Sequence, residues 1–143
     1  MTTVVEAGQA LPDLRKAVTQ EQINRYAEAS GDFNPIHLDA QFAAASSFGR
    51  IVAHGMLVLA FLSEMMTTAF GSAWLQSGQL KVRFRAPAYP GDEVTTFGQV
   101  TKVVDQERGR QAVCAVGCRN QQGEDLITGE ASVSLLTSRE IMK

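Results

Sequence analysis

The sequence predicts an α+β fold in which an antiparallel sheet curls around one central helix. The first half of the chain shows helical patterning, and the second half alternates apolar and polar residues as strands do. Residues 56–66 are apolar nearly all the way round, which predicts a buried helix. Strands joined by successive hairpins form a sheet with one apolar face to cover, and this helix is the expected cover.

Length and composition agree with one globular domain over residues 1–143. Apolar residues make up 45% and charged residues 20%, which is ordinary for such a domain. A net charge of −2 predicts no strongly basic face, so nucleic acid is not an expected partner. The start of the chain lacks the pattern of a secretory signal, and no apolar run is long enough to span a bilayer. We therefore expect a cytoplasmic protein with no membrane partner.

Three helices are expected in the first half. Thr19 can cap the first, with Gln22 three residues later as in a capping box, and Gly31 suits its left-handed C-terminal position. A loop then leads to a short helix that Asp39 can cap. The central helix follows and is expected to end at Gly71.

Four strands are expected in the second half, joined by turns rich in Gly, Asp and Gln. They are written in the sequence as GQLKVRFRAP, EVTTFGQVTKVV, RQAVCAVGCRN and LITGEASVSLL. Cys114 and Cys118 lie in the third strand, where four residues of strand separate their Cα atoms by roughly 13 Å. That distance is too long for a disulfide between them, so both are expected in the core.

The segment SGDFNPIHLD, residues 30–39, contains one of only two histidines in the chain. Gly, Asp, Asn and Pro are turn residues, so a plain loop between helices is one interpretation. The other is chemical, because a carboxylate and an imidazole are common acid–base groups at neutral pH. Asp32 and His37 could act on one water if the loop folds back so that their side chains converge.

A metal site is a third interpretation, since Asp32, Asn34, His37 and Asp39 all carry ligand atoms. The segment departs from a calcium-binding loop, however, with His37 where Gly is needed and Ala43 where an acid is needed. Phosphate-binding glycine loops and the G-x-S-x-G element of serine hydrolases do not occur. We therefore expect neither a metal nor a cofactor.

The second histidine, His54, stands where the central helix begins and is interpreted as a hydrogen-bonded structural residue. Gly55 comes next, in the first turn, where backbone N–H groups lack intrahelical acceptors and the helix dipole is positive. Without a side chain, Gly55 would let a ligand oxygen approach the backbone closely.

The stretch YAEASGDFNPIHLDAQFAAASSFGRIVAHGML resembles the signature of the R-specific enoyl-CoA hydratases and MaoC-like dehydratases, and the later VRFRAPAYPGDEV is similar to the segment that follows their central helix. The resemblance implies the hot-dog fold, a long helix wrapped by an antiparallel sheet. It also implies a homodimer or a dimer of dimers.

The activity that the resemblance implies is reversible addition of water to a trans-2-enoyl thioester of coenzyme A or acyl carrier protein, giving the (3R)-3-hydroxyacyl thioester. Asp32 and His37 match the family's catalytic dyad, and Gly55 matches the glycine whose N–H binds the thioester oxygen. Asn34 matches the motif asparagine, an organiser of the loop, and Ser63 matches a serine that supports this loop in some members. Gly55, Asn34 and Ser63 are thus the expected substrate-binding residues.

Two further functions remain as alternatives. A hot-dog acyl thioesterase would use an acid on the central helix, for which Glu64 is the candidate. A non-catalytic acyl-binding subunit would need no acid–base pair at all. The intact Asp32 and His37 pair disfavours both alternatives.

Overall fold

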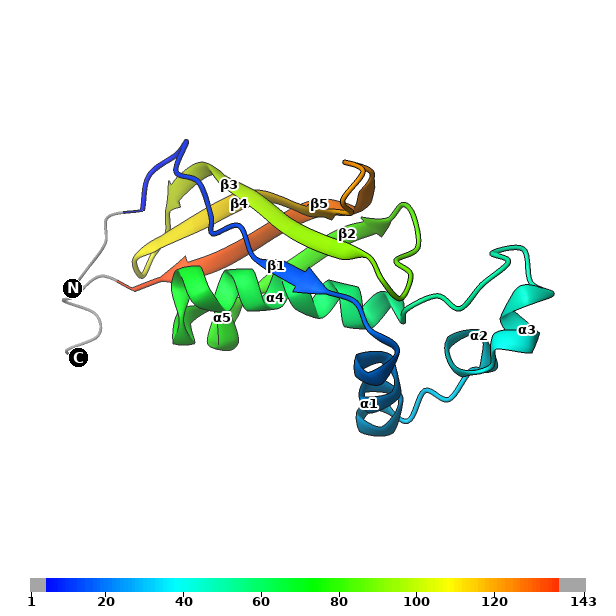
Figure 1. The fold of residues 1–143 in the computed structure, drawn as a ribbon. Coiled ribbons are helices and arrows are strands. Elements are labelled where there is room, and N and C mark those ends of the chain that lie inside the picture. Colours follow the sequence, from blue (N-terminus) through cyan, green and yellow to red (C-terminus); the bar gives the residue numbers. More distant parts are fainter. Residues whose placement is uncertain (1–4, 137–143) are drawn as a thin grey trace.

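The computed structural model describes residues 5–136, and the expectations that concern residues 1–4 and 137–143 lie outside this part. An antiparallel sheet lies along the central helix α4, α1 lies below one end of α4, and α2 and α3 lie beyond that end of the sheet (Figure 1). In chain order the elements are β1 (Arg15–Ala17), α1 (Gln20–Ser30), α2 (Pro35–Leu38), α3 (Ala40–Ala44), α4 (Gly55–Phe70), α5 (Ser72–Ser77), β2 (Gln79–Phe84), β3 (Glu93–Asp105), β4 (Arg110–Arg119) and β5 (Asp125–Leu135).

The sheet confirms the predicted α+β class. Its strand order is β1-β3-β4-β5-β2, and every neighbouring pair is antiparallel. All four predicted strands are present as β2 to β5. The pairing of β3 with β4 shifts register between Val100 and Lys102, the kind of irregularity that bends and twists a sheet.

One face of α4 supplies the centre of the core. Its buried side chains pack against buried residues of the sheet and are Leu57, Val58, Phe61, Leu62, Met65 and Met66. The opposite face is open in the single chain, where Met56 and Ala60 are exposed. The prediction of a helix buried all round is therefore wrong for one chain alone, because the sheet covers α4 from one side only.

The predicted helix ends are confirmed. The Thr19 hydroxyl accepts a hydrogen bond from the Gln22 N–H at 3.1 Å, and Gly31 ends α1 with φ of 77°. The side-chain oxygen of Gln22 is buried without a hydrogen-bond partner among the described residues, so it does not complete a capping box. Asp39 caps α3 by accepting two backbone N–H groups, and α4 ends at Gly71.

Three short elements were not predicted. α2 is a single turn in the expected loop, and it forms because Asn34 caps it and Pro35 suits the first helical position. β1 has only three residues, and α5 starts immediately after Gly71. None of these elements is long enough to show a hydrophobic period.

Both cysteines are unpaired and buried, which confirms the expectation that they belong to the core. Burial raises the pKa of the Cys114 thiol to about 11 and that of the Cys118 thiol to about 12. Both thiols thus stay protonated at neutral pH and act as small apolar groups. Within residues 5–136, no helix combines the length and apolar character needed to cross a membrane.

Candidate active site

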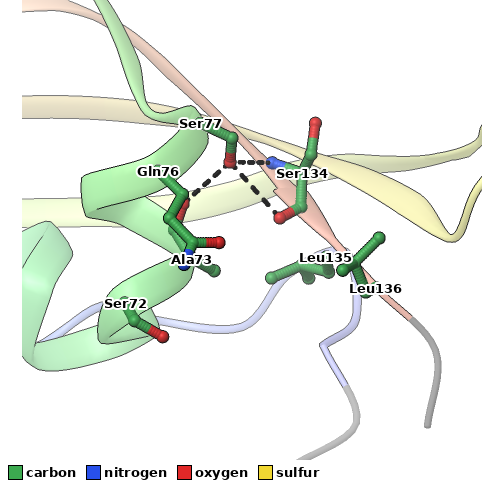
Figure 2. A pocket seen from close by; sticks show the side chains of 7 residues that line it. All are labelled: Ser72, Ala73, Gln76, Ser77, Ser134, Leu135 and Leu136. Carbon is green, nitrogen blue, oxygen red and sulfur yellow. Dashed lines mark hydrogen bonds between the residues drawn. The ribbon is translucent and has the colours of Figure 1, made fainter. Parts of the chain in front are cut away.

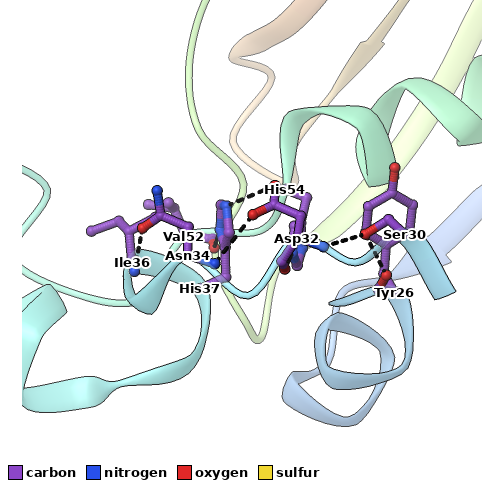
Figure 3. A network of polar contacts seen from close by, with 8 residues as sticks. All are labelled: Tyr26, Ser30, Asp32, Asn34, Ile36, His37, Val52 and His54. Atoms are coloured by element: carbon purple, nitrogen blue, oxygen red, sulfur yellow. Dashed lines mark hydrogen bonds and ion pairs between the residues drawn. The ribbon is translucent and has the colours of Figure 1, made fainter. Parts of the chain in front are cut away.

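The chemical groups of interest lie where α1 ends and α4 begins. Gly31 turns the chain out of α1 in a left-handed conformation, and the next residues lead through Asp32 into α2. Figure 3 shows the Asp32, His37 and His54 side chains gathered in one place. His54 comes from a different part of the chain, directly before α4. The loop does fold back, as a converging acid–base pair requires.

His37 is oriented by a backbone carbonyl. Its Nδ1 atom lies 2.7 Å from the oxygen of Val52, and a carbonyl oxygen can only accept, so Nδ1 carries a proton. The Nε2 atom is then the one left for chemistry. Only 12% of the His37 side chain is exposed, so the ring is held by its surroundings while Nε2 faces Asp32.

Asp32 faces this nitrogen with one carboxylate oxygen. Oδ2 lies 3.9 Å from Nε2 of His37, which is longer than a direct hydrogen bond. An oxygen atom of a third molecule could lie about 2.8 Å from both atoms at once. The arrangement is therefore suited to holding one water or hydroxyl group between an acid and a base.

His54 is part of this cluster, which the sequence did not reveal. It is only 2% exposed, and its Nε2 atom lies 3.0 Å from the main-chain oxygen of Asp32. Its ring stacks on His37 with 3.8 Å between centroids and 26° between planes. The predicted hydrogen bond exists, and its acceptor is the main-chain oxygen of Asp32. The available sequence signals were that His54 is one of two histidines and lies in the AHGML part of the family signature.

Gly55 is the first residue of α4, as predicted. A Cβ atom at this position would lie 3.1 Å from the ring of Phe84, so a larger residue would push on that ring. The first-turn N–H groups of a helix lack intrahelical acceptors and lie at the positive end of its dipole. This end of α4 can therefore receive a ligand oxygen.

The two remaining predicted residues have partners inside the protein. The side-chain oxygen of Asn34 accepts the Ile36 N–H at 3.0 Å and caps α2, as expected of a loop organiser. The Ser63 hydroxyl accepts a hydrogen bond from the indole N–H of Trp74 at 3.0 Å, which ties α4 to α5. Substrate binding by Asn34 or Ser63 stays a prediction.

Potential metal-ligand atoms of Asp32, His37 and His54 lie within 4.8 Å of one another, close enough by distance alone to bind one metal ion. Each imidazole already has one nitrogen bound to a carbonyl oxygen. Imidazole binds metals in the plane of its ring, and the planes of the two stacked rings are only 26° apart, so one ion close to both rings cannot lie in both planes. This geometry does not fit two histidines on one ion, and the Asn34 and Asp39 side chains serve as helix caps.

A separate hollow of about 620 Å³ lies between α5 and the end of β5, lined by serines, leucines and Gln76 (Figure 2). Ser77 bridges its two walls, accepting the Ser134 N–H at 2.9 Å. The hollow adjoins the C-terminal end of α4, whereas the Asp32–His37 pair adjoins the N-terminal end. Since α4 has 16 residues and a helix rises about 1.5 Å per residue, the two are well apart.

A family model described as "MaoC like domain" matches residues 4–122, which is most of the chain. The chain belongs to the MaoC-like family. The resemblance noted in the sequence is thereby confirmed.

Relatives of this MaoC-like chain include named hydratases and dehydratases. An (R)-specific enoyl-CoA hydratase from Aeromonas caviae is 35% identical over 85% of this chain and 90% of its own length. A mitochondrial 3-hydroxyacyl-[acyl-carrier-protein] dehydratase from Arabidopsis thaliana is 31% identical over 93% of this chain and 79% of its own length.

Among solved structures, the (R)-hydratase from A. caviae involved in PHA biosynthesis superposes with a TM-score of 0.81 at 31% identity. The superposition covers 94% of this chain and 99% of the other. This likeness confirms the hot-dog fold expected for a MaoC-like protein.

Proposed function

We propose that the protein is an R-specific enoyl-CoA hydratase, working in reverse as a (3R)-3-hydroxyacyl thioester dehydratase. The observation that supports this most directly is the 3.9 Å gap between His37 Nε2 and Asp32 Oδ2. The gap lies close to the N-terminal turn of α4, where the N-cap residue His54 makes no side-chain capping hydrogen bond. The names of the relatives point to the same reaction.

In the proposed reaction the Asp32–His37 dyad holds the water that attacks C3 of the enoyl thioester. The C3–O bond forms as one O–H bond of water breaks, and the π electrons move through C2 toward the thioester oxygen. The dyad takes the proton from water and delivers a proton to C2, which restores the thioester. The thioester itself acidifies the α-carbon, so the proposed reaction needs neither a cofactor nor a metal.

Gly55 has the role of the oxyanion donor in this proposal. Negative charge develops on the thioester oxygen when water adds, and a positioned backbone N–H stabilises such charge. The dipole of α4 has the favourable sign at this end. Asn34 would keep the loop in shape, and Ser63 retains its predicted supporting role only as an expectation.

We also propose that the working unit is at least a homodimer, with a dimer of dimers as the larger form. β2 is an edge strand, and an edge strand offers unpaired N–H and C=O groups to another chain. Large apolar side chains near the dyad are exposed in the single chain: Phe33 at 58%, Met56 at 57% and Phe84 at 55%. A second copy would cover this surface and supply walls for the acyl chain.

The buried, unpaired cysteines support a cytoplasmic location.

The thioesterase alternative is less well supported, because Glu64 forms an ion pair with Lys16 at 2.8 Å on the outside of α4. The experiment that separates the functions is addition of crotonyl-CoA to the purified protein. Loss of the absorbance of the conjugated thioester without release of free thiol would indicate hydration. Thiol release would indicate hydrolysis, and no change with either crotonyl-CoA or crotonyl carrier protein would indicate a binding subunit.

A further inference from the structure

We infer that His54 is a positioning residue, which acts through its hydrogen bond to the main-chain oxygen of Asp32. This inference rests on the proposed function of the Asp32–His37 dyad. The N–H on Nε2 of His54 is the donor, because the Asp32 carbonyl can only accept. In this role His54 acts through Asp32 and not through contact with the substrate.

Asp32 is held at three points, and each limits where Oδ2 can go. Its N–H donates to the Ser30 hydroxyl at 3.2 Å, its carbonyl accepts from His54 at 3.0 Å, and its Oδ1 accepts the Asn34 N–H at 3.2 Å. Oδ2 is the oxygen left to face His37. The carboxylate is thus aimed before substrate arrives, which is the condition for efficient acid–base catalysis.

The three contacts differ in how well they resist water. Ser30, Asp32 and Asn34 are exposed, so water competes for the hydrogen bonds among them. His54 is 2% exposed, and its ring is enclosed between His37 at 3.8 Å and Tyr26 at 4.8 Å. Its hydrogen bond is therefore the best protected of the three contacts and ties Asp32 to the start of α4.

Two substitutions of His54 separate the role of its N–H donor from the role of its aromatic ring. His54→Phe keeps an aromatic ring against His37 and Tyr26 but cannot donate to Asp32. His54→Gln loses the ring and keeps an N–H donor at a similar reach. We expect His54→Phe to lower kcat for crotonyl-CoA hydration by about 10- to 100-fold, with KM changed less than about threefold, and His54→Gln to recover much of the loss.

If His54 were only structural, its substitution would lower kcat by the same factor whether or not Asp32 is intact. A double-mutant cycle tests this. In the Asp32→Asn background, adding His54→Phe should lower kcat by less than about threefold, because the group that His54 aims is already disabled. Val133→Ala, a buried substitution in β5, serves as a control for lost stability and should keep kcat despite a lower Tm.

Three results would overturn the inference: normal kcat in His54→Phe, equal losses in His54→Phe and His54→Gln, or fully independent effects in the cycle. If Asp32→Asn itself keeps normal turnover, the proposed dyad fails. If Asp32→Asn is inactive while His54→Phe is normal, only the role of His54 fails.

Discussion

The Nε2 atom of His37 and the Oδ2 atom of Asp32 face each other across 3.9 Å, a separation that suits a shared third oxygen better than a direct hydrogen bond. A tight ion pair would occupy both groups with each other. The proton of His37 Nδ1 is already donated to the Val52 carbonyl, so Nε2 is the available atom.

Asp32→Asn and His37→Gln should each fold normally and lose about 10²- to 10⁴-fold in kcat, the usual effect of removing a positioned acid or base. Hydration of crotonyl-CoA measures the rate, and circular dichroism checks the fold. His54→Gln is the matched histidine control and should lose much less than His37→Gln. Near-normal turnover in either dyad variant would refute the assignment.

The pairing of Asp32 and His37 could be expected from the sequence, because turn residues allow the loop to fold back and the motif resembles the catalytic dyad of the MaoC-like family. The place of His54 could not. Its contact with the Asp32 carbonyl depends on how residues 38–53 return to α4, and no local pattern encodes that path.

The errors about α4 and α2 have physical reasons too. An apolar helix looks the same in sequence whether a sheet or a second chain covers its outer face, so Met56 and Ala60 were expected to be buried. Pro35 was interpreted as a loop residue, although proline also suits the first turn of a helix.

Gly55→Ala should lower kcat/KM by about tenfold or more, because the added methyl group crowds the approach to the backbone N–H. The Cβ atom would lie 3.1 Å from the Phe84 ring, so Phe84→Ala provides the control. If Gly55→Ala is equally harmful in the Phe84→Ala background, the methyl group blocks the ligand oxygen. Recovery in the double variant would instead attribute the loss to the displaced ring.

Ser63→Ala separates the predicted role of Ser63 in supporting the loop from the contact that the structure shows. Removing the hydroxyl leaves the indole N–H of Trp74, a residue only 7% exposed, without its acceptor. We expect a loss of about 1–3 kcal/mol in the free energy of unfolding, with kcat/KM within about threefold of the parent. Urea unfolding and crotonyl-CoA kinetics measure the two effects. A large loss of kcat/KM at unchanged stability would instead support the predicted role of Ser63 in the active site.

The parent protein should be a dimer or larger at micromolar concentration by light scattering. Ala60→Glu puts a charge on the exposed face of α4 and should shift it toward monomer, with a loss of activity, because an interface core tolerates buried charge poorly. Glu107→Ala, in the loop between β3 and β4, is a charge-changing control and should keep the oligomer. A fully active monomeric parent would contradict this prediction.

The stereochemistry of hydration tests the mechanism beyond activity. Asp32 and His37 lie on one short segment and face one gap, so both must act on the same face of a planar enoyl group. Gly55, at the start of α4, would bind the thioester oxygen and determine which face is presented. The hydroxyl and the proton should therefore add syn, giving the R alcohol that the family assignment implies. Hydration of crotonyl-CoA in deuterated water, followed by chiral analysis, reports both centres. An S product would contradict the proposed function, whereas an R product formed by anti addition would require a proton donor outside residues 32–37.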